Sequence, residues 1–182
     1  MHRQPLLDLL DRYEIAHPEE KETVSRFREF VVAHADCCER SLGIGHLTGS
    51  AWIVDRDGGR VLLTHHRKLG RWLQPGGHAD GETDLLAVAL KEGLEETGLG
   101  NLAALDGEIF DLDIHPIPAR GEESAHFHYD VRFLLRDGGD GRYIVSEESH
   151  DLAWVAMAAL ETFTDEDSML RMRDKCLSRA MR

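Results

Sequence analysis

A glycine turn followed by a short helix with three glutamates constrains this chain more than any other feature. The turn is Gly76-Gly77, and the apolar spacing after it predicts a helix over about residues 84–97. Glu92, Glu95 and Glu96 follow an i, i+3, i+4 spacing, so they fall within one narrow arc of that helix. Like charges at this spacing repel one another. A divalent cation explains the arrangement, because Mg²⁺ and Mn²⁺ prefer carboxylate and carbonyl oxygens. The alternative is a solvated acidic helix face.

The same segment resembles the Nudix box, whose pattern is Gly, five residues, Glu, seven residues, then Arg-Glu-hydrophobic-x-Glu-Glu-x-Gly-hydrophobic. The box covers residues 77–99 here, and the matching positions are Gly77, Glu92, Glu95, Glu96, Gly98 and Leu99. Three positions, where the family has Glu, Arg and a hydrophobic residue, depart from it: Thr83, Lys91 and Gly93. In the family the Glu and the Arg pair and hold the helix in place. We expect Glu82 or Asp84 to take over the pairing with Lys91.

The resemblance implies an enzyme that hydrolyses the diphosphate linkage of a nucleoside diphosphate joined to another moiety, with Mg²⁺ or Mn²⁺ as its cofactor. It implies that the metal ligands are Glu92, Glu95, Glu96 and the backbone carbonyl of Gly76. A carboxylate within the box or on a later loop is implied as the general base. The later acidic residues are Glu122, Glu123, Glu147 and Glu148, of which Glu148 best matches the downstream position of the family. The alternative is a non-catalytic Nudix module that binds a nucleotide or metabolite as a sensor.

Composition limits the partners. The formal net charge of −13 repels nucleic acid polymers, so a small anionic, phosphate-containing substrate is expected. A locally basic segment before the box contains Arg67, Lys68 and Arg71, which we expect to bind that substrate. A solvated hairpin tip is the alternative. The apolar runs are too short for a membrane span and the amino end has no signal pattern, so a cytoplasmic location is expected. A homodimer is compatible with the sequence.

Eleven histidines are many for a chain of 182 residues, and His66, His78, His126 and His128 invite a metal interpretation. His126 and His128 share one face of a predicted strand, on which Phe127 and Tyr129 alternate with them toward the core. We expect these two histidines to contact substrate or to form a half-exposed polar face. If they bind metal instead, Zn²⁺, Co²⁺ or Ni²⁺ is preferred over Mg²⁺.

The patterns predict an α/β fold, and the resemblance implies a Nudix-type α/β/α sandwich with a mixed sheet, over residues 46–182. Residues 1–45 form an N-terminal helical extension, whose second helix presents Val24, Phe27, Phe30 and Val31. Strands are expected at residues 50–54, 61–64, 108–114, 126–135, 143–145 and 152–155, and a closing helix at 167–181. The box helix is expected to have Thr83 as its N-cap and to bury Leu86, Leu90 and Leu94.

Overall fold

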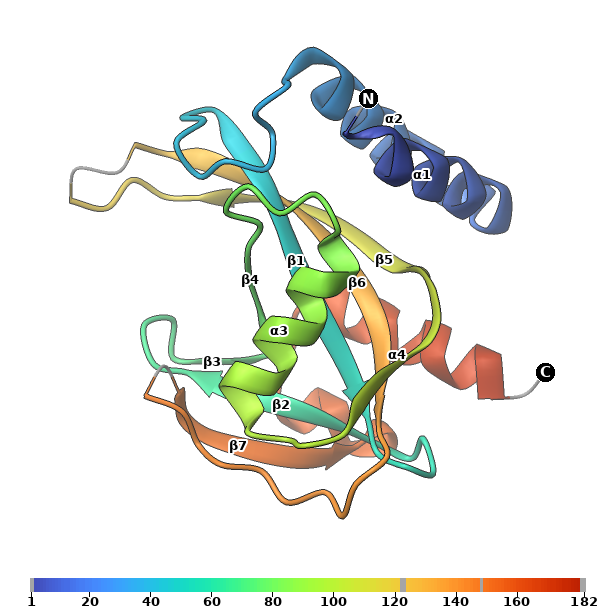
Figure 1. Ribbon diagram of the computed structural model, residues 1–182. Coiled ribbons are helices and arrows are strands. Elements are labelled where there is room, and N and C mark those ends of the chain that lie inside the picture. Colours follow the sequence, from blue (N-terminus) through green and yellow to red (C-terminus); the bar gives the residue numbers. More distant parts are fainter. Residues whose placement is uncertain (1, 122–123, 148, 181–182) are drawn as a thin grey trace.

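A mixed sheet forms the centre of the computed structural model, which describes residues 2–121, 124–147 and 149–180 (Figure 1). In the described part of the chain the sheet has seven strands in the order β3-β2-β1-β6-β5, with β4 also paired to β1 and β7 to β2. The pairing of β1 with β6 is parallel and the other pairings are antiparallel. The strands are β1 (Gly45–Val54), β2 (Arg60–His66), β3 (Arg71–Leu73), β4 (Gly76–His78), β5 (Leu102–Ile117), β6 (His126–Asp137) and β7 (Ser149–Ala156).

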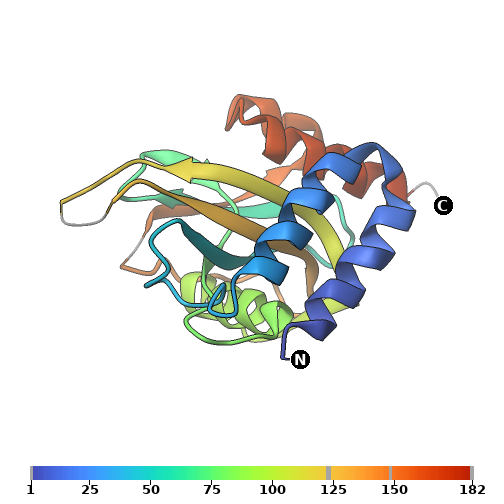
Figure 2. The ribbon, with the colours of Figure 1, turned by 90° about the horizontal axis from the view of Figure 1, so that it is seen from above.

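Helices cover both faces of this sheet. Helix α3 (Leu85–Thr97) lies on one face, and η2 (Met157–Thr162) and α4 (Asp167–Ala180) lie on the other (Figure 2). Strand β1 is buried along its whole length because its side chains point alternately to the two faces of the sheet, and helices cover both faces. Ala51 and Ile53 belong to the core on the α3 side, and Trp52 packs with Met169 and Met172 on the α4 side. The predicted α/β/α sandwich is confirmed.

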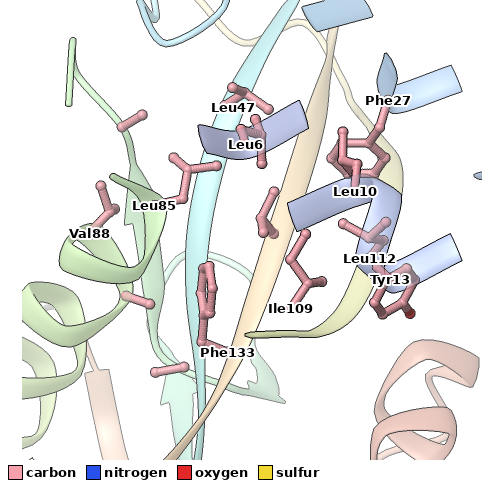
Figure 3. Close-up of a cluster of buried hydrophobic side chains, with 14 of the residues drawn as sticks. Leu6, Leu10, Tyr13, Phe27, Leu47, Leu85, Val88, Ile109, Leu112 and Phe133 are labelled. Carbon is pink, nitrogen blue, oxygen red and sulfur yellow. The ribbon is translucent and has the colours of Figure 1, made fainter. Parts of the chain in front are cut away.

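The N-terminal helices α1 (Gln4–Ala16) and α2 (Lys21–Ala33), joined by η1 (Pro18–Glu20), pack against the edge of the sheet at β5. The predicted apolar face of α2 is confirmed, since Val24, Phe27, Phe30 and Val31 are all buried. Phe30 stacks on Tyr129 of β6 with ring centroids 3.8 Å apart. Figure 3 shows Leu6 and Leu10 of α1 in the same core as Ile109, Leu112 and Phe133. The extension therefore shares its hydrophobic core with the sheet.

A buried carboxylate also links the extension to the closing helix. Asp111 of β5 is fully buried and lies 2.7 Å from the Nζ of Lys175 and 2.8 Å from Nη2 of Arg171, both on α4. The same Lys175 ammonium donates to the hydroxyl of Tyr13 at 2.6 Å and lies 2.5 Å from the carboxylate of Glu20. Burial first, and then the negative charges of Asp111 and Glu20, raise the pKa of Tyr13 far above its ordinary value. The phenol therefore stays protonated.

One expected strand needs correction. The segment 143–145 is irregular instead of a strand, and the indole Nε1 of Trp154 donates to the carbonyl of nearby Gly141 at 2.8 Å. Backbone groups in this segment use other partners, such as the Ile144 N–H, which donates to the carbonyl of Thr97 at 2.7 Å. The closing helix is confirmed as far as Ala180, and Met181 lies outside the described residues. Within the described part of the chain, no helix has both the length and the apolar character that a bilayer crossing requires.

Candidate active site

The sequence predicts a turn at Gly76-Gly77, but these residues begin strand β4 and are extended. This pair, for which we keep the name glycine turn, brings backbone against side chains on both sides of β4. Gly76 pairs with Ser50 of β1, and Gly77 pairs with Gly49. A Cβ atom placed on Gly77 would lie 2.5 Å from Cδ of Glu92, and one placed on Gly76 would lie 2.1 Å from Oγ of Ser50. Real Cβ atoms do not approach other heavy atoms so closely. A side chain at residue 76 would also meet the backbone Cα of Ser50 at 3.0 Å, and one at residue 77 would force the Glu92 carboxylate to move. The two glycines let the turn lie directly against the glutamates of α3.

The N-terminus of α3 is capped by Asp84, and the prediction of Thr83 as the cap is wrong. The Asp84 carboxylate accepts hydrogen bonds from the N–H groups of Leu86 at 3.1 Å and Ala87 at 3.2 Å. Thr83 lies one residue too early, and its own N–H donates to the carboxylate of Glu82. At the other end Gly98 adopts the left-handed conformation, with φ of 66°, that ends many helices.

The buried face of α3 also differs from the predicted one. Leu85, Val88 and Ala89 are buried, whereas Leu94 is 41% exposed. Leu86 and Leu90 are only partly buried at the margin of the core. The reason lies in β1: at Gly49 the missing side chain admits α3, and a Cβ there would lie 2.7 Å from the carbonyl oxygen of Leu85 and 2.9 Å from Cβ of Val88. Close backbone packing therefore overrides the leucine periodicity.

Gly93 lies against side chains of the core. A Cβ on Gly93 would lie 3.1 Å from Cδ1 of Leu102 and 3.4 Å from Cδ1 of Ile53. The larger hydrophobic side chain that the family pattern has at this position would require these neighbours to move. This departure from the pattern is thus matched to the local core.

The three box glutamates lie at three different depths. The Glu96 carboxylate is buried and accepts a hydrogen bond from the N–H of Gly76 at 2.8 Å. The side chain of Glu92 is 18% exposed and that of Glu95 is 61% exposed. The turn therefore fixes Glu96 and confines Glu92, while Glu95 extends into solvent.

Lys91 lies between two of these glutamates. Its Nζ is 3.3 Å from Oε1 of Glu92 and 3.5 Å from Oε2 of Glu95. The hydrogen bond to Glu92, followed by the charges of Glu92 and Glu95, raises the pKa of Lys91. The expectation that Glu82 or Asp84 pairs with Lys91 is wrong, because both carboxylates bind backbone N–H groups at the start of the helix. Lys91 instead offsets part of the negative charge of the box.

This arrangement fits a hard divalent cation. The donors are carboxylate oxygens, and they stand against a turn whose glycines leave no room for side chains. Gly76, whose carbonyl is the predicted backbone ligand, belongs to the same turn. Grouping Glu92, Glu95 and Glu96 on one helix costs repulsion that the single positive charge of Lys91 offsets only in part. A bound cation would offset the remainder.

The basic residues predicted to bind substrate lie in the connection between β2 and β3 and at the first residue of β3 (Figure 1). Arg67 donates to the backbone carbonyl of Ser149 at 3.2 Å, and Arg71 forms an ion pair with Glu166. Lys68 is exposed. The structure therefore gives Arg67 and Arg71 local structural partners and leaves Lys68 on the surface. Glu122, Glu123 and Glu148, the last of them the predicted downstream base, lie outside the described residues.

A histidine cluster occupies the face of the sheet opposite α3. His46 of β1, His78 of β4 and His128 of β6 each offer a ring nitrogen, and these nitrogens all lie within 4.8 Å of one another. The ring of His126 lies 4.9 Å from that of His46. The sequence indicated His66, His78, His126 and His128. His78 and His128 belong to the cluster, and His126 lies beside it. His66 ends β2 and is not part of the cluster. The sequence missed His46, because His46 joins the others through strand pairing that a single sequence does not reveal.

Most of the polar face of β6 is buried. His126 contradicts the half-exposed face considered from the sequence, whereas His128 is half-buried. His126 is 6% exposed, Asp130 2% and Arg132 3%. Burial first, and then the charges of His115, His46 and His78, lower the pKa of His128 to about 3. The imidazole of His128 is therefore neutral near pH 7, with an unprotonated ring nitrogen.

The chain is similar to known proteins in sequence and in fold. The family model described as NUDIX domain matches residues 46–176. The Ap4A hydrolase of C. elegans, in a binary complex, superposes with a TM-score of 0.60 at 17% identity, over 74% of this chain and 97% of that one. A MutT protein from Methanosarcina mazei superposes with a TM-score of 0.56 at 16% identity, over 78% of this chain and 99% of that one. The E. coli dihydroneopterin triphosphate pyrophosphohydrolase superposes with a TM-score of 0.53 at 15% identity, over 71% of this chain and 91% of that one. No curated protein matches the chain.

Proposed function

The chain belongs to the Nudix family of pyrophosphohydrolases, and on this premise we propose that it uses Mg²⁺ or Mn²⁺ to hydrolyse a nucleoside diphosphate linked to another moiety. The observation that carries the proposal is the contact between the glycine turn and the box glutamates. Glu96 is held by the N–H of Gly76, and Glu92 lies where any side chain on Gly77 would have to be. These contacts support the proposal, because the three glutamates of the motif are present and two of them lie against the glycine turn.

The ligands of the cation would be Glu92, Glu95, Glu96 and the carbonyl of Gly76. When bound, such a cation neutralises phosphate oxygens and lowers the pKa of water. The protein holds two of these ligands in place before the cation binds. Buried Glu96 and confined Glu92 need to move little on binding, because the glycine turn and the helix already hold them. The positive charge of Lys91 limits the repulsion between the glutamates and an anionic substrate.

Two carboxylates are candidates for the general base. Glu95 is the most exposed of the box glutamates, so it can exchange a proton with water. Glu148 is the candidate that the family pattern favours. A carboxylate that accepts a proton from the attacking water makes that water a better nucleophile toward phosphorus.

The substrate is proposed to be small and anionic. Lys68 and the neighbouring Arg67 and Arg71 provide positive charge on a chain of net charge −13, which disfavours nucleic acid polymers. The structural neighbours are named for a dinucleoside polyphosphate and for a pterin triphosphate, so the shared fold is compatible with different leaving moieties. Contact of substrate with His126 and His128, a homodimer and a cytoplasmic location stay predictions.

A substrate panel tests this proposal. Dinucleoside polyphosphates, nucleoside diphosphate sugars and nucleoside triphosphates are incubated with the protein in Mn²⁺, in Mg²⁺ and in chelator, and phosphate-containing products are measured. We expect at least one diphosphate linkage to be cleaved with either metal and none in chelator. Tight binding of a panel compound without any cleavage would favour the alternative function, a non-catalytic sensor module.

A further inference from the structure

We propose that His46, His78 and His128 form a second cation site, selective for a divalent transition metal such as Zn²⁺ and separate from the glutamates of α3. The proposal does not depend on the hydrolase activity. It starts from the convergence of three ring nitrogens, all within 4.8 Å of one another, on three neighbouring strands. Imidazole nitrogen is a preferred ligand of Zn²⁺, Co²⁺ and Ni²⁺, whereas Mg²⁺ prefers oxygen.

Strand pairing explains why the three rings meet. His46 stands directly opposite His128 in the parallel pairing of β1 with β6, and His78 stands opposite Thr48 in the pairing of β4 with β1. Residues that face each other across a pairing share one side of the sheet, and residues i and i+2 of a strand do the same. All three rings therefore project from the same side. Their centroids are 4.8 to 5.1 Å apart.

The spacing is close to that of a coordinated set. Two nitrogens bound to one tetrahedral Zn²⁺ at about 2.0–2.1 Å are separated by about 3.3 Å. The nitrogens of the cluster lie within 4.8 Å, so rotations of the rings about their side-chain bonds need to close a gap of at most about 1.5 Å. His126, whose ring lies 4.9 Å from that of His46, stands beside the set and offers a fourth nitrogen.

A buried ring nitrogen points to a bound ligand. Ring Nε2 of His128 is buried without a hydrogen-bond partner in the structure. An unprotonated imidazole nitrogen donates its lone pair to a metal ion. At His126 the Nδ1 lies 2.9 Å from the carbonyl oxygen of Ser124. Donation of the Nδ1 proton to that carbonyl would leave Nε2 as the lone-pair donor, as in many metal-bound histidines.

Alternation along β4 separates this site from the box. A Cβ on Gly77 would point at Glu92 on α3, whereas one on Gly76 would point at Ser50 on the other side of the sheet. His78 is two residues after Gly76 in the same strand, so its side chain points to the face of the sheet on which Ser50 lies. The imidazoles and the glutamates thus lie on opposite faces, and each set has the donor type of a different metal class.

Metal titration of the purified, metal-stripped protein tests the proposal. The double variant Glu95→Gln with Glu96→Gln is titrated with Zn²⁺ by calorimetry, with excess Mg²⁺ present, so that the box contributes little. We expect one Zn²⁺ to bind per chain. In the same background, His78→Asn or His128→Asn should lower the Zn²⁺ affinity at least about tenfold. His150→Asn, which changes an exposed histidine of β7, is the control and should bind Zn²⁺ unchanged.

A second readout keeps the test decisive if one variant folds poorly. Zn²⁺ should raise the midpoint of thermal unfolding of the wild-type chain and of His150→Asn, and should not raise that of the folded cluster variants, because a ligand stabilises only the state that binds it. His78 is half-buried at a strand end, so His78→Asn is the variant least exposed to folding defects. Zn²⁺ binding of equal strength in His78→Asn and in the control, or no binding in the double variant, would overturn the proposal.

Discussion

At the scale of single residues, the glycine turn has the strictest requirements. Glu92 and Gly77 occupy adjoining space, and any side chain at residue 77 would displace the carboxylate. The sequence could predict that glycine was needed before the helix, since the turn and the glutamate spacing are both local. It could not show that Glu96 would be buried and bound to the N–H of Gly76, because that contact joins residues twenty positions apart.

Gly77→Ala is therefore expected to lower metal-dependent turnover at least tenfold, because the new Cβ would lie 2.5 Å from Cδ of Glu92 and force it away. Gly59→Ala is the matched control, since Gly59 has no atom within 4 Å of its hypothetical Cβ and its φ is not positive. Turnover at saturating Mn²⁺ is measured for both variants. Equal activity in the two would mean that the position of Glu92 does not matter.

At the scale of elements, the sequence predicted the helices better than it predicted their faces. The box helix was placed to within a residue, yet its cap is Asp84 and its buried face runs through Leu85 and Val88. Local spacing favours Leu86, Leu90 and Leu94, and only the approach of α3 to Gly49 decides otherwise.

The same limit applies to β6, where Phe127, predicted to face the core, is 42% exposed and most of the polar face is buried. The carboxylate of Asp130 accepts hydrogen bonds from the hydroxyls of Thr48 and Ser50, both at 2.8 Å, and from Nε of Arg132 at 2.7 Å. Such a network is formed by residues from distant segments, and hydrophobic periodicity carries no sign of it.

The cap of α3 gives a test at this scale. Asp84→Ala should lower the free energy of unfolding by about 1 kcal/mol, because two N–H groups of the first turn lose their acceptor. Thr83→Ala should change it far less, since the Thr83 side chain is not the cap. Urea denaturation of both variants measures the difference. A larger loss in Thr83→Ala than in Asp84→Ala would return the cap to Thr83.

At the scale of the whole molecule, buried charges join the sheet to helices from both ends of the chain. Arg132 lies 3.2 Å from both Asp111 and Asp113, and Arg171 of α4 contacts the same two carboxylates. Through Lys175 the network continues to Tyr13 of the extension. Removing one charged residue of this network leaves its buried partners without an opposite charge, which destabilises the folded state.

This network makes stability depend on pH. Burial alone would raise the pKa of Asp113, but the hydrogen bond to His115 and the charge of Arg132 outweigh burial and lower it to about 2. A carboxyl with a lowered folded-state pKa stabilises the protein above its unfolded value near 3.8, and the contribution is lost as pH falls toward 2. With a side chain 21% exposed, a shift of this size corresponds to about 2 kcal/mol.

Asp113→Asn should therefore be less stable than wild type by up to about 2 kcal/mol at pH 7, and roughly half of that difference should have disappeared at pH 3. Denaturant unfolding at several pH values between 7 and 3 measures it. Asp140→Asn changes an exposed carboxylate and is the control; its free energy of unfolding should match that of wild type at each pH. A difference that did not change with pH would assign the effect of Asp113 to packing instead of charge.

The central claim is that the glutamates on α3 hold the cation that drives hydrolysis. The measurement that tests it most directly is turnover of the best diphosphate substrate at saturating Mn²⁺ for wild type, Glu95→Gln and Glu96→Gln. The exchange keeps side-chain volume and removes the ligand charge, so both variants should lose metal-dependent turnover, while their thermal unfolding in chelator should hardly change. Full activity in either variant would contradict the claim.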